Sequence, residues 1–142
     1  MRTVAQLLKA KDNQVYFVAP TDSVLHAIRE MAVRHVGALL VMEQDRLLGI
    51  ISERDYARKV ILNNRASHDT PVADIMTASP VTVAPPDTTH HCMKIMTQGR
   101  FRHLPVVEGG RVIGVLSIGD LVKAVIAEQS EHIEQLERYI AG

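Results

Sequence analysis

GIISERD, residues 49–55, joins a glycine and two isoleucines directly to a serine, two carboxylates and a guanidinium. GVLSIGD, residues 114–120, repeats this pattern 65 positions later. A short apolar run that meets a Ser-x-x-Asp group without an intervening turn is typical of a buried strand ending where a helix begins. The repeated junction therefore predicts two copies of one supersecondary unit.

The repeat extends on both sides of the junction without a gap. Val18-Ala19-Pro20 aligns with Val83-Ala84-Pro85, for example, and Met31 with Met96. In each copy, strand and helix periodicities follow the order β-α-β-β-α. We expect strands at 15–18 and 81–83, helices starting near Asp22 and Asp87, hairpins at 37–51 and 104–116, and closing helices at 56–62 and 121–127.

These elements predict an α/β (α+β) fold of two pseudo-symmetric repeats with flanking N- and C-terminal helices. A repeat of about 60 residues buries too little surface to be stable alone, so we expect the repeats to pack through their sheets around one shared core. The expected boundaries are residues 1–64 for the first repeat with an N-terminal helix, 65–128 for the second, and 129–142 for an amphipathic C-terminal helix. A short helical turn is expected at 72–76, after Pro71.

The composition argues against several classes of partner. Sixteen basic residues balance sixteen acidic ones, and aromatic residues make up only 4% of the chain, so neither a basic field nor a stacking surface for nucleic acid is expected. The apolar runs are much shorter than the roughly 20 residues of a membrane span. The single cysteine, Cys92, fits a reducing compartment, and we expect a cytoplasmic protein without a membrane anchor.

The junction itself has two interpretations. Ser-x-x-Asp matches a capping box, in which the serine caps the helix and the acid returns a hydrogen bond. The same aspartate could instead accept hydrogen bonds from the neighbouring hydroxyls of a sugar. Gly49 or Gly114 would then leave room for a flat ring, and the free N–H groups of the helix start would favour an anion. Together these features would suit a nucleotide.

The doubled unit resembles a tandem pair of CBS domains, a Bateman module. The resemblance covers about residues 3–128 and includes Phe101–Val107, which is similar to the second-copy signature of that family. It implies a regulatory, non-catalytic protein that binds an adenosine-containing ligand (AMP, ADP, ATP, NAD-type or S-adenosylmethionine) in clefts between the copies. It also implies a homodimer formed through helices and an effector protein that the sequence does not identify.

The resemblance also implies roles for individual residues. Asp55 and Asp120 would hold ribose hydroxyls, Ser52 and Ser117 would contact ribose or phosphate, and His103 would reach for phosphate. The candidate ligand-binding residues are Val18, Ala19, Ser52, Arg54, Asp55, Arg58, Val83, Ala84, Arg102, His103, Leu104, Pro105, Ser117 and Asp120. Because the ordinary pKa of histidine is about 6.5, phosphate affinity is expected to fall between about pH 6 and pH 8.

Other signals favour neither a metal site nor an enzyme. His90, His91 and Cys92 are consecutive, and consecutive helix positions point about 100° apart, so they cannot converge on one ion. No matched acid and base stand outside the repeated motif. The alternative to a nucleotide sensor is a structural or protein-interaction module that dimerises and whose clefts are vestigial.

Overall fold

The computed structural model describes residues 2–11 and 14–141. Its contacts divide the chain into two compact units, one made of residues 15–81 and the other of residues 1–14 together with 82–142. Each unit has its own cluster of buried hydrophobic side chains. Each repeat is thus built around a core of its own.

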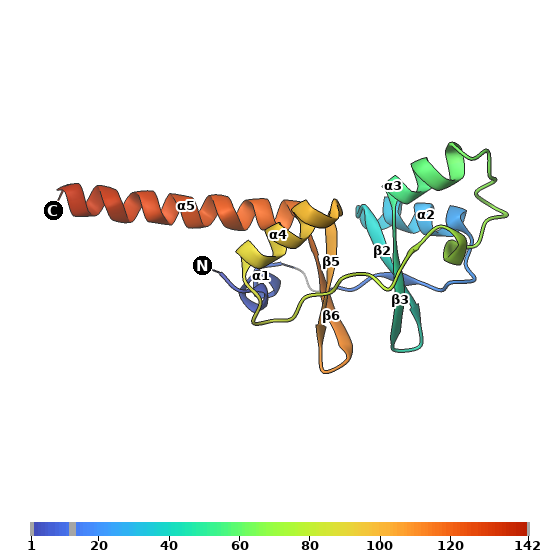
Figure 1. Cartoon of the computed structure of the whole chain (residues 1–142), viewed down its shortest axis with the longest axis horizontal. Coiled ribbons are helices and arrows are strands. Elements are labelled where there is room, and N and C mark those ends of the chain that lie inside the picture. Colours follow the sequence, from blue (N-terminus) through green and yellow to red (C-terminus); the bar gives the residue numbers. More distant parts are fainter. Residues whose placement is uncertain (1, 12–13, 142) are drawn as a thin grey trace. The chain divides into compact units, whose positions relative to one another are not determined.

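The middle unit contains a four-stranded sheet in the order β1-β2-β3-β4 (Figure 1). Its strands and helices, in chain order, are β1 (Phe17–Val18), α2 (Val24–Arg34), β2 (Ala38–Glu43), β3 (Arg46–Ser52), α3 (Glu53–Tyr56), the π-helix η1 (Ala57–Ile61), the 3-10 helix η2 (Val72–Asp74) and β4 (Thr77–Ala78). Strand β1 pairs with β2 in parallel, and the other pairs are antiparallel.

The other unit repeats this plan with a shorter sheet. It contains α1 (Val4–Lys9), α4 (Thr89–Gly99), β5 (His103–Glu108), β6 (Arg111–Ser117) and α5 (Ile118–Ala141). The β5–β6 hairpin has the same antiparallel register as β2–β3, and Val83 forms a parallel bridge with Val106 where β1 pairs in the middle unit. The β-α-β-β-α order is thus confirmed for the first copy, and in the second the strand expected at 81–83 is reduced to the single bridge of Val83.

The helix starts differ in detail from the prediction. Ser23 and Thr88 cap α2 and α4, each accepting a hydrogen bond from a backbone N–H three residues later. Asp22 and Asp87 lie one residue earlier, and their side chains accept from the backbone N–H groups of Ala19 and Ala84 at 2.9 and 2.8 Å. The two aspartates therefore close the turns that follow the first strand of each copy instead of capping the helices.

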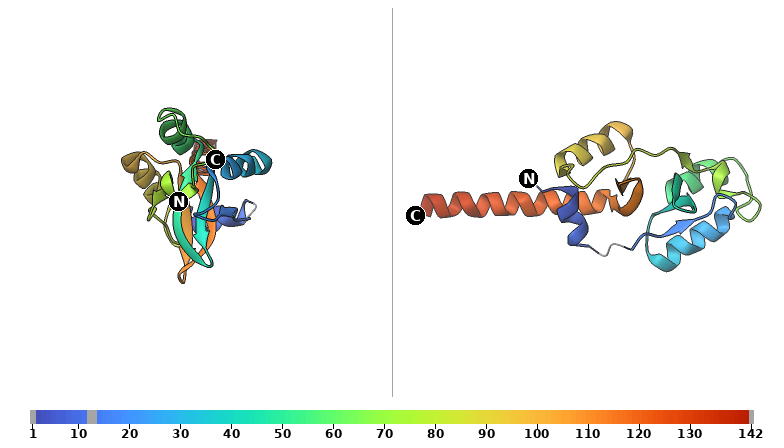
Figure 2. Two further views of the ribbon diagram at one scale, coloured as in Figure 1. Left: turned by 90° about the vertical axis from the view of Figure 1, so that its right-hand side faces the viewer. Right: turned by 90° about the horizontal axis from the view of Figure 1, so that it is seen from below.

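The C-terminal helix is also longer than predicted. The sequence suggested a closing helix at 121–127 and a separate helix at 129–142, whereas α5 is one continuous 24-residue helix (Figures 1 and 2). Leu121 and Ala124 on its first turns are buried, but residues 129–141 are all exposed. Nothing between the two segments breaks the helix, because residues 121–129 contain neither glycine nor proline.

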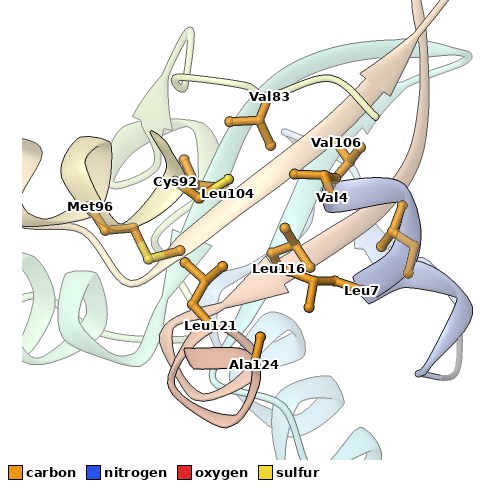
Figure 3. Packing of buried hydrophobic residues seen from close by; sticks show 11 residues of the cluster. Val4, Leu7, Val83, Cys92, Met96, Leu104, Val106, Leu116, Leu121 and Ala124 are labelled. Atoms are coloured by element: carbon orange, nitrogen blue, oxygen red, sulfur yellow. The ribbon is translucent and has the colours of Figure 1, made fainter. Parts of the chain in front are cut away.

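The N-terminal helix packs with the second repeat, although the sequence analysis grouped it with the first. Val4 donates its backbone N–H to Asp87 O at 2.8 Å, and Arg2 forms an ion pair with Glu131 of α5 at 2.7 Å. Figure 3 shows Val4 and Leu7 of α1 directed toward Leu116 of β6. Helix α1 therefore completes the core of the unit that contains the second repeat.

The segment before the second repeat packs on the first repeat in the same manner. Val72 donates its backbone N–H to Asp22 O at 2.8 Å, as Val4 does to Asp87 O. The sequences VAQLLKAK (4–11) and VADIMTAS (72–79) share this role. We call these two stretches the exchanged segments, because each precedes one repeat in sequence and packs on the other.

The exchanged segments explain Gly49 and Gly114. A Cβ atom added to Gly49 would lie 2.7 Å from both Met76 Sδ and Thr77 O, and one added to Gly114 would lie 2.7 Å from Leu8 Cδ2. The space above each glycine is thus filled by an exchanged segment. This contradicts the interpretation that the glycines leave room for a flat ring.

Alanine at these two positions is expected to have unequal effects. Gly49→Ala should lower the free energy of unfolding by about 1–3 kcal/mol, because the new methyl group meets a backbone carbonyl that cannot rotate away. Gly114→Ala should cost less, since only the flexible end of Leu8 must move and alanine is less costly than glycine in a strand. Urea denaturation of both variants measures the difference, and equal losses would contradict this account.

Candidate functional site

The first Ser-x-x-Asp group forms a complete capping box at the start of α3. Asp55 N donates to Ser52 Oγ at 3.2 Å, and Ser52 N donates to Asp55 Oδ2 at 3.0 Å. The serine hydroxyl also donates to the same carboxylate oxygen at 3.1 Å. The group lies at the end of β3, where Glu53 N donates to Gly37 O, so the hairpin fixes its position.

The second group has the same geometry at the start of α5. Ser117 N donates to Asp120 Oδ2 at 2.8 Å, and Asp120 N donates to Ser117 Oγ at 3.2 Å. Ile118 N donates to Arg102 O, as Glu53 N donates to Gly37 O in the other unit. The capping interpretation of the motif is therefore correct for both copies. It leaves a sugar-binding role open, because both aspartates are partly exposed.

A lysine that the sequence analysis missed contacts each of these aspartates. Lys11 Nζ lies 2.8 Å from Asp120 Oδ2 and donates to Val115 O at 2.8 Å. Lys59 Nζ lies 3.4 Å from Asp55 Oδ1 and donates to Ile75 O at 2.9 Å. Lys59 could have been found from its i,i+4 spacing to Asp55, whereas no local pattern connects Lys11 with Asp120.

Charge and burial around Asp120 shift two pKa values. Burial alone would raise the pKa of Asp120, but hydrogen bonds and charge from Lys11 together with the bonds from Ser117 lower it overall. The pKa of His103 is lowered, chiefly by burial and also by the positive charges of Lys11 and Arg102, against the opposing charge of Asp120. Lys11, Arg102, His103 and Asp120 therefore form one electrostatic group.

The lowered pKa of His103 bears on the predicted pH dependence. The prediction that phosphate affinity falls between about pH 6 and pH 8 rests on the ordinary histidine value. Because burial lowers the pKa of His103, its charge is lost at a lower pH than that value implies. The fall in phosphate affinity stays a prediction, with its midpoint moved to lower pH.

The same shift predicts an effect on stability. At pH values between the lowered pKa of folded His103 and its ordinary value in the unfolded chain, the unfolded chain binds more protons than the folded one. The free energy of unfolding therefore has its full value above about pH 6.5 and decreases as the pH falls toward the folded pKa. His103→Gln should therefore lose less stability than the wild type between pH 7.5 and pH 5. Urea denaturation at both pH values measures this, with exposed His132→Gln as the control. Identical losses in wild type and His103→Gln would contradict the shift.

The structure places the other candidate residues in three settings. Arg54, Arg58 and Arg102 have exposed side chains near the helix starts or the beginning of β5. Four candidates have side chains that are buried in the protein and are not available to a ligand at the surface, namely Val18, Val83, Leu104 and Pro105. Ala19 and Ala84 are partly exposed.

The backbone of the two alanines is already used within the turns. Ala19 N donates to Asp22 Oδ2 and Ala19 O accepts from Asp22 N, and Ala84 and Asp87 repeat both bonds. At these two candidate positions the N–H groups therefore have internal partners, whereas each carbonyl, which has two lone pairs, could accept one more hydrogen bond from a ligand.

Two further sequence signals have structural explanations. Cys92 is fully buried in α4, and burial, with the nearby charge of Asp87, raises its pKa to about 11, so the thiol is protonated at neutral pH.

Within residues 2–11 and 14–141, no three His, Cys, Asp or Glu side chains are grouped as metal ligands. In the same ranges, no helix has the length and apolar character needed to cross a membrane.

Comparison with known proteins identifies two matches to one family model. The model of the CBS domain matches residues 5–62 and 72–127. The mitochondrial CBS domain-containing protein CBSX3 of Arabidopsis thaliana is 40% identical over 99% of this chain and 72% of its own. The chain spans only about a quarter of the length of several other plant relatives.

Solved structures agree with these matches. A CBS-domain protein from Burkholderia ambifaria superimposes with a TM-score of 0.86 and is 53% identical, covering 89% of this chain and 96% of its own. The protein PAE2072 of Pyrobaculum aerophilum, solved in complex with AMP, has a TM-score of 0.78 and 26% identity, covering 92% of this chain and 99% of its own. The mixed α/β architecture is thus shared with solved relatives.

Proposed function

The chain belongs to the CBS-domain family, and from that premise we propose that it is a regulatory sensor of an adenosine-containing ligand, with no chemistry of its own. The ligand would be AMP, ADP, ATP or an NAD-type dinucleotide. The observation that carries the proposal is the pair of equivalent carboxylates, Asp55 and Asp120, each fixed at a helix start by the serine three residues earlier. The AMP complex of PAE2072 supports an adenine nucleotide as the ligand class.

The physical argument concerns what each aspartate can still accept. A carboxylate has about four lone-pair sites. The capping box uses two of them in Asp55 and one in Asp120, in each case on Oδ2. The ribose of an adenosine ligand offers two neighbouring hydroxyl donors that can bind such a carboxylate through charge-assisted hydrogen bonds. Exposed Arg102 would add positive charge for phosphate at the second copy, and partly exposed His103 could donate a hydrogen bond to it.

The two copies are proposed to differ in affinity. In the second copy, Arg102 lies just before β5 and His103 is the first residue of that strand. The equivalent positions at the start of β2 are Gly37 and Ala38, which carry no charge. The first copy instead has Arg54 and Arg58 beside Asp55. We therefore propose that phosphorylated ligands distinguish the two sites, and that Asp120 contributes more than Asp55 to mononucleotide binding.

Thermal unfolding with AMP, ADP, ATP, NAD and S-adenosylmethionine tests the proposal. A ligand present at 100 times its dissociation constant should add about 2.7 kcal/mol to the free energy of unfolding. The matched control is the double variant Asp55→Asn/Asp120→Asn, which should show a much smaller shift with the same ligand. If no ligand changes the melting temperature of the wild-type protein, the sensor proposal is refuted.

The second candidate function is a dimerising structural module whose ligand sites are vestigial. It is favoured by apolar side chains that α5 exposes at spacings of seven, three and four residues, namely Ile126, Ile133, Leu136 and Ile140, which are 58%, 54%, 48% and 83% exposed. A homodimer would cover these residues and is compatible with either function. Light scattering at micromolar concentration should give twice the chain mass, and a monomer would count against the dimer.

A further inference from the structure

The contact between Lys11 and Asp120 joins two distant parts of the chain. Lys11 follows α1 in the first exchanged segment, and Asp120 lies in the first turn of α5. Lys11 Nζ is 2.8 Å from Asp120 Oδ2, the same oxygen that accepts from Ser117 N. The side chains of Lys11 and Asp120 are 32% and 23% exposed, so the pair is partly shielded from water.

The second copy alone has this arrangement. In the exchanged segments, Lys11 of VAQLLKAK aligns with Ser79 of VADIMTAS, and the uncharged serine side chain cannot form an ion pair. Asp55 instead contacts Lys59, which comes from its own helix and is 3.4 Å from the other carboxylate oxygen, Oδ1. Oδ2 of Asp55 accepts hydrogen bonds from Ser52 N and Ser52 Oγ, both within its capping box.

Oδ2 of Asp120 has little capacity for a third donor. A carboxylate oxygen accepts about two hydrogen bonds, and here Ser117 N and Lys11 Nζ supply them at 2.8 Å each. The two hydroxyls of a ribose bind a carboxylate best when each finds its own oxygen. One of the two positions that a sugar diol needs at Asp120 is thus occupied by the protein itself.

We propose that Lys11 is a latch on the second Ser-x-x-Asp site, so that binding of a vicinal diol to Asp120 and pairing of Lys11 with Asp120 exclude one another. The inference rests on the proposed function and adds a regulatory consequence to it. Lys11 lies in the stretch through which the chain passes from the unit containing α1 to the unit that begins at Val15. A ligand that displaces Lys11 from Asp120 would therefore remove one contact that holds the start of this stretch to the unit containing α5.

The first test is the affinity of Lys11→Met, measured by calorimetric titration with AMP and with adenosine. Methionine keeps much of the volume of the lysine stem but cannot occupy Asp120, so both ligands should bind about three- to tenfold more tightly than they bind the wild type. Lys11→Arg retains the charge and should remain close to the wild type. Lys9→Met removes an exposed charge from the end of α1, two residues before Lys11, and should leave both affinities unchanged.

Amide hydrogen exchange over residues 4–11 gives a second readout. In the wild type, AMP should increase exchange in this segment, because ligand binding and Lys11 pairing oppose each other by the same factor. In Lys11→Met, exchange should already be faster without ligand, and AMP should change it little. This pattern would not follow from a lysine that only stabilises the fold.

The outcomes separate this inference from the proposed function. If the wild type binds AMP in an Asp120-dependent way and Lys11→Met binds no more tightly, the latch is refuted and the sensor proposal stands. If Lys11→Met binds an adenosine ligand and the wild type binds none, the latch is supported and the sensor proposal is refuted for the wild-type chain. If neither binds any adenosine ligand, both are refuted and the ion pair is purely structural.

Discussion

Asp120→Ala is expected to weaken binding of an adenosine ligand at least about tenfold and to lower the free energy of unfolding by about 0.5–2 kcal/mol. The loss of affinity follows from the loss of charge-assisted hydrogen bonds to ribose, each worth about 1.5–3 kcal/mol. The loss of stability follows from removal of the capping bond to Ser117 N. Calorimetric titration and urea denaturation measure the two effects separately.

Asp120→Asn separates the two roles in one residue. An asparagine side-chain oxygen can still accept from Ser117 N, so most of the cap should remain. It has one acceptor oxygen in place of two and no charge, so affinity should fall nearly as far as in Asp120→Ala. The same pair of substitutions at Asp55 should have a smaller effect on mononucleotides. If alanine at both positions lowers only the melting temperature, the motif is a helix cap and nothing more.

Leu121→Ala should produce the largest loss of stability, about 2–5 kcal/mol. Leu121 is fully buried, and Figure 3 shows it on the first turns of α5 among side chains from α4, β5 and β6. Truncation removes apolar contacts from all these elements and leaves a cavity that the sheet cannot fill. Urea denaturation measures the change.

Lys123→Ala is the matched control for Leu121→Ala. Lys123 lies two residues further along the same helix and is exposed, so its truncation should change the free energy of unfolding by no more than about 0.5 kcal/mol. Comparable losses in the two variants would mean that the first turns of α5 are not packed as described here.

The repeat made most of the local structure predictable. Strands β2, β3, β5 and β6 fall within a residue or two of their predicted bounds, because apolar runs bounded by polar turns are strong local signals. The short helical turn after Pro71 is confirmed as η2. Helix continuity was less predictable: the periodicity of 121–127 and of 129–142 was visible, but only the structure shows one uninterrupted helix.

The exchanged segments escaped prediction because their partners are distant in sequence. Val4 bonds to Asp87, and Lys11 contacts Asp120, so no window of neighbouring residues contains either interaction. The similarity of VAQLLKAK and VADIMTAS was present in the sequence, and it shows that the repeated unit begins before the first strand. Gly49 and Gly114 were noticed for their small size, but what fills the space above them depends on this exchange.

The exchange also determines the order in which the protein can be completed during synthesis. Helix α1 is synthesised before the middle unit, residues 15–81, whereas the strands and the helix that enclose Val4 and Leu7 are synthesised after it. The apolar side chains of α1 therefore cannot reach their final partners until β6 and the first turns of α5 have been made.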